Sequence, residues 1–171
     1  LDRARQKGTG KWTSQDAMDL QVPVPTIDSA VSMRDMSGYK DQREIAARQL
    51  SGPDNRTAGG EITVQAIRKA FYGAMIVTYA QGMALLRTAS DAYGYGLRLH
   101  DVARIWREGC IIRARLLDDI EAAYRKRPDL PNLLLDDHIS KAVMELQQDV
   151  RHIVRSAVNA GVPIPSFMAT V

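Results

Sequence analysis

The segment from Thr63 to Ala92 reads TVQAIRKAFYGAMIVTYAQGMALLRTASDA and carries the strongest helix signal in the chain. Its apolar residues recur near the helical period, and its middle is apolar around most of its circumference. A helix of that kind is usually central and covered by other helices. We therefore predict a long central helix in which Ile67, Phe71 and Val77 are buried.

Helical patterns also lie on the N-terminal side of this segment. Thr13–Asp16 has the spacing of a capping box and predicts the start of a short helix. Two prolines within residues 22–25 end that helix, and Thr26 or Asp28 can cap the next one. Residues 40–50 indicate either a continuation of this second helix or a third helix.

On the C-terminal side, Tyr93–Gly96 ends the long helix, and further helical patterns follow at residues 101–108 and 110–124. Asp136 or Asp137 can cap a last helix that runs to about Ala160, with Gly161 just beyond its end. No segment alternates strictly between apolar and polar residues. We therefore predict an all-α fold of six to eight helices, in which residues 1–171 form a single domain.

The composition places the chain among ordinary globular proteins. Of its 171 residues, 45% are hydrophobic and 25% charged, and no apolar run is long enough to span a membrane. The N-terminus lacks the apolar core of a signal peptide, and Cys110 has no second cysteine to pair with. We expect a cytoplasmic protein without a membrane partner. The net charge of +3 suggests nucleic acid, but basic and acidic residues are interleaved, so we expect no nucleic-acid partner.

The residues from Lys7 to Thr13 read KGTGKWT and combine the groups that bind an anion. Backbone N–H groups freed by glycine, a hydroxyl and ammonium groups suit a phosphate or a carboxylate. The spacing is neither that of a P-loop nor that of a dinucleotide-binding fingerprint. From spacing alone, a plain loop entering a helix is favoured, and an anion site remains open. If the loop uses positive φ, Gly8 and Gly10 should resist β-branched substitutions.

Other chemistry-bearing residues give weaker signals. His100, His138 and His152 show no zinc-binding spacing, so we expect no metal site. The carboxylate pairs at residues 118–119 and 136–137 are interpreted as a solvated face and a helix cap, because adjacent helical residues do not face each other. Arg34 follows the KGTGKWT loop by one short helix and could fold back on it, although the residues alone favour an ion pair at the surface.

Six segments of the chain together resemble one protein family, in order and spacing, over nearly the whole sequence. They are QKGTGKWTSQDAMDL (Gln6–Leu20), YKDQREIAARQLSGP (Tyr39–Pro53), IVTYAQGMALLRTAS (Ile76–Ser90), WREGCIIRARLL (Trp106–Leu117), NLLLDD (Asn132–Asp137) and AGVPIPSF (Ala160–Phe167). The family they resemble is 6-phosphogluconate dehydrogenase, and the region is the central part of its helical C-terminal domain. Residues 54–60 match less well.

The resemblance implies both an activity and a binding site. The family oxidises 6-phosphogluconate at C3 with NADP⁺ and then decarboxylates the product to ribulose 5-phosphate, without a metal. A lysine and a threonine of its KGTGKW motif contact the substrate phosphate and fall on Lys7 and Thr9, within a phosphate loop at residues 6–13. A phosphate-binding arginine of the next helix falls on Arg34. An ammonium, a hydroxyl and a guanidinium would then converge on one dianion.

The resemblance also implies that other parts of the enzyme lie outside this sequence. The Rossmann domain that binds NADP⁺, the catalytic lysine and glutamate, and a tail that enters the partner subunit have no counterpart here. We therefore expect part of a homodimeric enzyme of the pentose phosphate pathway, with this region forming much of the interface and the chain alone inactive.

Two other classes of protein stay open. The first is a non-catalytic helical interaction domain derived from the family, and the gene distinguishes it by whether a Rossmann domain is encoded upstream. The second is a helical nucleic-acid-binding protein, which would show salt-sensitive DNA binding.

Overall fold

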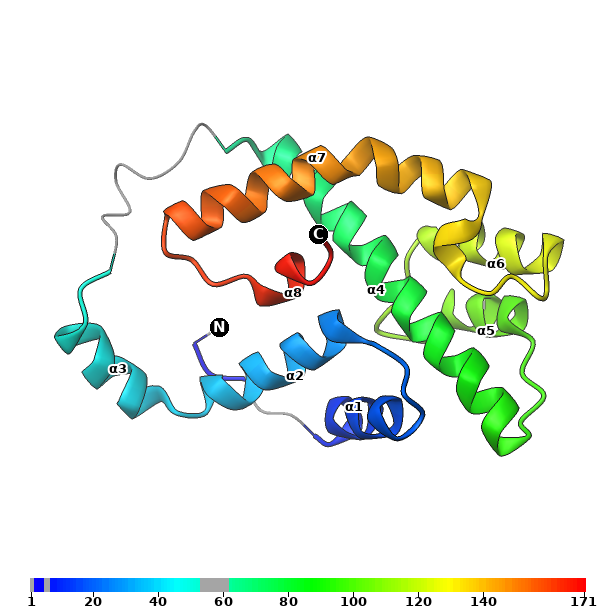
Figure 1. Ribbon diagram of the computed structural model, residues 1–171, viewed down its shortest axis with the longest axis horizontal. Coiled ribbons are helices and arrows are strands. Elements are labelled where there is room, and N and C mark those ends of the chain that lie inside the picture. The colour runs from blue at the N-terminus through cyan, green and yellow to red at the C-terminus, as the bar shows by residue number, and fades with distance from the viewer. Residues whose placement is uncertain (1, 5–6, 53–61) are drawn as a thin grey trace.

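The computed structural model describes residues 2–4, 7–52 and 62–171, and within these ranges the chain is all-helical, with eight α-helices, one 3₁₀ helix and no strand. This confirms the predicted fold class. Figure 1 shows the helices arranged around the long helix α4. In chain order they are α1 (Thr9–Asp19), α2 (Pro25–Ser37), α3 (Lys40–Gln49), α4 (Val64–Tyr93), α5 (Leu99–Trp106), α6 (Leu116–Lys126), η1 (Leu133–Leu135), α7 (Asp137–Asn159) and α8 (Pro165–Met168).

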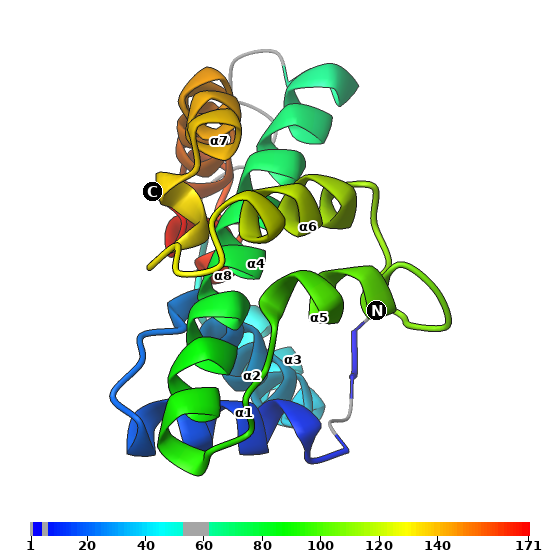
Figure 2. The same cartoon turned by 90° about the vertical axis from the view of Figure 1, so that its right-hand side faces the viewer.

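Local signals set both ends of α4, and both ends agree with the sequence. The Thr63 hydroxyl accepts a hydrogen bond from the Ala66 N–H at 3.1 Å, which caps the helix at its start. Gly94 ends it in the left-handed conformation with φ 69°. Near the middle, Gly73 lets α7 approach closely, since a Cβ built there would lie 3.0 Å from a Val150 methyl. Figure 2 shows α7 alongside α4.

The main core lies between α4, α5, α6 and α7. Its largest fully buried members include Ile76, Met83, Ile120 and Tyr124. The prediction that Ile67 and Phe71 are buried is wrong, because their side chains are 47% and 58% exposed, and Val77 is only half-buried.

The helical period explains this error. The buried side of α4 follows residues 73, 76, 80 and 83, and five residues turn a helix through about 140°, so Phe71 lies well round the helix from Ile76. Phe71 instead faces Phe167 of α8, with ring centroids 6.4 Å apart.

A second, smaller apolar cluster holds α1 and α2 against the C-terminal half of α4, and its buried members are Ala17, Val24 and Leu85. At this junction the Gln81 side chain of α4 accepts hydrogen bonds from both the Thr26 N–H (3.0 Å) and the Thr26 hydroxyl (2.7 Å). Thr26 is therefore not the cap of α2, since the helix begins at Pro25 and Gln81 satisfies one of its free N–H groups from outside.

Residues 107–115 form a loop rather than the predicted start of a helix at Cys110, because Gly109 takes a positive φ of 69°. Two side chains hold the backbone carbonyls of this loop. Arg107 donates to the Ala114 carbonyl at 3.1 Å, and the Tyr79 hydroxyl of α4 donates to the Ile112 carbonyl. Helix α6 consequently begins at Leu116.

The molecule leaves much apolar surface exposed. Large hydrophobic residues that are more than half exposed include Trp12, Leu50 and Ile111. Figure 1 shows α3 at the periphery, away from α4 to α7, and its Ile45 is 53% exposed. Surface of this extent and kind is typical of a chain that packs against further protein.

Candidate functional site

The loop at Lys7–Thr9 enters α1 through Gly8. Gly8 has φ 103°, as the sequence suggests, and its carbonyl accepts the N–H of Trp12 at 2.8 Å. The helix therefore begins at Thr9, four residues before the predicted capping box. Thr13 makes no cap, because its hydroxyl donates to the Thr9 carbonyl at 2.8 Å inside the helix. The first N–H groups of α1 lack partners within the helix and bear its positive dipole end.

The sequence predicts that Gly10 resists β-branched substitution if it has a positive φ. Gly10 has no positive φ, and it is needed for close packing instead. It lies within α1, and a Cβ built on it would stand 2.9 Å from a Val31 methyl of α2. The start of α1 is thus fixed against α2 at Val31.

Gly10→Val should therefore destabilise the protein by roughly 1–3 kcal/mol, the usual cost of overpacking. Lys11→Val, on the exposed neighbouring residue, is the control for placing a β-branched side chain in the first turn of α1. Urea unfolding measures both, and Val31→Ala should rescue part of the Gly10→Val loss. Equal costs for Gly10→Val and Lys11→Val would show that the contact with Val31 is unimportant.

The chain before the loop is fixed to the other end of α2. The Ser37 hydroxyl accepts the Ala4 N–H at 2.9 Å and lies within hydrogen-bond distance of two carbonyls, Arg34 at 2.7 Å and Ala4 at 2.9 Å. Sequence reasoning missed this contact, because it joins residues 33 positions apart and a lone serine gives no signal for it.

These two contacts fix the chain on both sides of Lys7 to α2, the helix that bears Arg34. Val31, Arg34 and Ser37 follow each other at three-residue intervals, so they share that face. Ala4 is bound at Ser37 and Gly10 packs at Val31. Lys7 lies three residues after Ala4 and three before Gly10. Arg34 likewise lies three residues from Val31 and three from Ser37. The Lys7, Thr9 and Arg34 residues are all exposed, and Arg34 also stands in the last turn of its helix.

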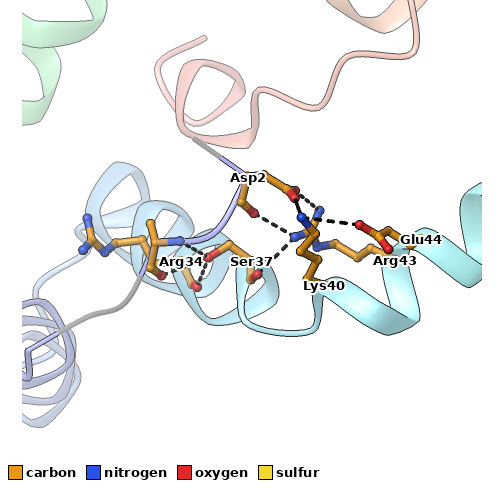
Figure 3. A network of polar contacts seen from close by, with 7 residues as sticks. Asp2, Arg34, Ser37, Lys40, Arg43 and Glu44 are labelled. Carbon is orange, nitrogen blue, oxygen red and sulfur yellow. Dashed lines mark hydrogen bonds and ion pairs between the residues drawn. The ribbon is translucent and has the colours of Figure 1, made fainter.

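An ionic cluster at the junction of α2 and α3 holds Asp2. Lys40 lies 2.9 Å and Arg43 2.9 Å from its two carboxylate oxygens. Hydrogen bonds from Lys40 and then Arg43 lower the pKa of Asp2 to about 2. Because the pKa of Asp2 is lower in the folded state, its ionised carboxylate stabilises the fold at pH values above 3.8. This contribution is lost as the pH falls toward 2. Figure 3 shows this cluster beside Ser37, with Arg34 extending away from it.

A large apolar groove begins at the loop and runs between α1, α4 and residues 111–114. Its volume is about 1140 Å³, and Thr9 is one of its lining residues. Trp12 and Ile111 line it too, and their side chains are 64% and 100% exposed. The Tyr93 hydroxyl bonds Asp16 at 2.6 Å and ties α1 to the end of α4, which raises the pKa of Tyr93 to about 12. The loop therefore opens onto space that can take a larger group than a phosphate.

The carboxylates at residues 118–119 and Asp136 form ion pairs or cap a helix. Asp136 caps α7 by accepting the N–H groups of His138 and Ile139, as predicted. Asp118 pairs with Arg107 at 2.5 Å, and Asp119 lies 3.7 Å from the His138 ring. Within the described ranges, no three His, Cys, Asp or Glu side chains are grouped so that they could hold a metal ion. No helix in the same ranges has the length and hydropathy needed to cross a membrane.

Comparison with known proteins identifies the relatives of this chain. The family model described as 6-phosphogluconate dehydrogenase, C-terminal domain, matches residues 1–171. A decarboxylating 6-phosphogluconate dehydrogenase of Lactococcus lactis (strain IL1403) is 47% identical over 100% of this chain and 36% of its own length. The NADP⁺-dependent decarboxylating enzyme of Bacillus subtilis (strain 168) is 46% identical over 98% of this chain and 36% of its own length.

A solved structure of this family has the same fold as this chain. The Plasmodium falciparum 6-phosphogluconate dehydrogenase, studied in its apo form and in complexes with NADP⁺ and with 6-phosphogluconate, superposes with a TM-score of 0.92. Its sequence is 36% identical, and the match covers 99% of this chain and 37% of that one. The chain thus spans about 36% of the length of the curated relatives it matches. It belongs to the 6-phosphogluconate dehydrogenase family, and it corresponds to the C-terminal domain of that family.

Proposed function

We propose that this chain is part of an NADP-dependent, decarboxylating 6-phosphogluconate dehydrogenase and that it supplies part of the site for the substrate's phosphate. The observation that carries the proposal is the bracketing of Lys7 by two contacts with α2, one at Ser37 and one at Val31, on the face that bears Arg34. The names of the relatives support the activity.

In this proposal, Lys7 and Arg34 provide positive charge and N–H donors, and Thr9 provides a hydroxyl. Charge-assisted hydrogen bonds to phosphate are stronger than those between neutral groups, and the fork of an arginine can bind two oxygens at once. The N-terminus of α1 adds backbone donors and a favourable dipole.

NADP⁺ supplies the hydride acceptor of the family's reaction when bound. The residues that the structure describes do not fit a dinucleotide site of the usual kind, because no strand leads through a glycine-rich turn into a helix among them. The proposal therefore places NADP⁺ mainly outside residues 1–171.

A homodimer and a cytoplasmic location belong to the same proposal. The exposed apolar side chains of the domain, among them Trp12 and Ile111, support the dimer, because large exposed apolar patches mark sites of contact between proteins. The single cysteine, Cys110, forms no internal disulfide, which is compatible with a reducing compartment.

An assay of the full-length protein tests the function. We expect NADP⁺ reduction and CO₂ release with 6-phosphogluconate, and much slower turnover with unphosphorylated gluconate at the same concentration. A protein that reduced NADP⁺ with neither substrate would contradict the proposal and favour a non-catalytic interaction domain.

A further inference from the structure

We propose that Ser37 and Arg43 are positioning residues that clamp residues 2–4 to the end of α2 and thereby set where Lys7 and Thr9 stand relative to Arg34. This inference rests on the proposed function. Neither residue is expected to touch the substrate. Their contribution is to hold the phosphate loop in its binding geometry before the ligand arrives.

Ser37 joins the two segments directly. Its hydroxyl accepts the Ala4 N–H at 2.9 Å, and it can donate to the carbonyl of Arg34 at 2.7 Å or of Ala4 at 2.9 Å. The Ser37 side chain thus contacts the backbone of Ala4, on the segment that leads to Lys7, and the backbone of Arg34, the predicted phosphate ligand. Loss of the hydroxyl would leave the Ala4 N–H without this acceptor.

Arg43 reinforces this joint from α3. Its guanidinium donates to the Asp2 carboxylate at 2.9 Å, to the Asp2 carbonyl at 2.8 Å and to the Ser37 carbonyl at 3.1 Å. The planar fork therefore binds both segments at once, which a lysine could not reproduce. Lys40 adds an ion pair to Asp2 at 2.9 Å. Figure 3 shows Ser37, Arg43 and Asp2 as one connected network.

The geometry explains why the loop needs this second anchor. Gly10 contacts Val31 from within α1, whereas Lys7 precedes that helix and lies three residues from each anchor in sequence. The contact of Gly10 with Val31 alone would leave Lys7 free to explore many positions, and ordering it would then weaken substrate binding.

Steady-state kinetics of the full-length protein test the clamp. Ser37→Ala should raise KM for 6-phosphogluconate by roughly two- to tenfold, the effect of one hydrogen bond, and should leave kcat and KM for NADP⁺ near the wild-type values. Ser37→Thr keeps the hydroxyl and should restore KM to within about twofold. Arg43→Ala should act in the same direction as Ser37→Ala.

Matched controls separate this effect from general damage to the helices. Ser32→Ala changes an exposed serine of α2, and Arg48→Ala an exposed arginine of α3; both should leave KM unchanged. In hydrogen–deuterium exchange, Ser37→Ala should speed exchange at Ala4 and in the first turn of α1, whereas Ser32→Ala should not. The exchange readout applies even to a variant with little activity.

The outcomes distinguish the clamp from the phosphate site itself. In the background of Arg34→Ala, Ser37→Ala should have a smaller effect than in the wild type, because both act on the same phosphate. If Arg34→Ala lowers the preference for phosphorylated substrate but Ser37→Ala changes neither KM nor exchange, the clamp is overturned and the phosphate site stands. If neither variant alters that preference, the phosphate site falls, and the clamp's role in binding falls with it.

Discussion

Arg34→Ala in the full-length protein is expected to raise KM for 6-phosphogluconate by roughly 10- to 100-fold, the range for a lost hydrogen bond to a charged group. The phosphate lies at the far end of the substrate from C3, so its contacts persist from ground state to transition state. Such uniform binding affects KM more than kcat. Lys7→Ala should have a similar or slightly smaller effect, and Thr9→Ala a smaller one, because a neutral hydroxyl binds phosphate more weakly than a cation.

The control for this prediction is a second arginine in an equivalent place. Arg48 stands in the last turn of α3 as Arg34 does in the last turn of α2, and both are exposed, so Arg48→Ala removes a comparable charge away from the loop. Unphosphorylated gluconate supplies the second comparison. If Arg34→Ala weakened turnover of gluconate and of 6-phosphogluconate by the same factor, Arg34 would not be a phosphate ligand, and a surface ion pair would account for it.

The features that could be predicted from the sequence are those determined by neighbouring residues. The ends of α4 follow from the hydroxyl of Thr63 and the left-handed Gly94, each acting within its own turn. The Asp136 cap of α7 is likewise local. The residues of the proposed phosphate site follow from a family resemblance, because spacing alone favours a plain loop over an anion site.

The features that could not be predicted depend on contacts between distant segments. Helix α1 begins at Thr9 because Gly8 turns the chain there and Gly10 fits against Val31 of the next helix. The clamp at Ser37 spans 33 residues, and the cap that Gln81 provides for α2 spans 55. A serine or a glutamine in a helical pattern carries no information about a partner so far away. Such contacts emerge only when the helices are assembled.

The choice of the buried face of α4 shows the same limit and leads to a stability prediction. Apolar residues occur around most of this helix, so periodicity gives several possible faces. The neighbours α5, α6 and α7 select the face with Ile76, which is fully buried, and leave Phe71 58% exposed. A large apolar side chain is therefore weak evidence of burial when its helix is apolar on every side.

Ile76→Ala should lower the free energy of unfolding by roughly 2–5 kcal/mol, since it removes buried methyl groups and leaves a cavity in the main core. Phe71→Ala removes a larger side chain but should cost only about 1 kcal/mol, most of it from the ring contact with Phe167 at 6.4 Å. Urea unfolding of the two variants in the same polypeptide measures the difference. A Phe71→Ala variant as unstable as Ile76→Ala would contradict the exposed position of Phe71 and restore the face that the sequence pattern favours.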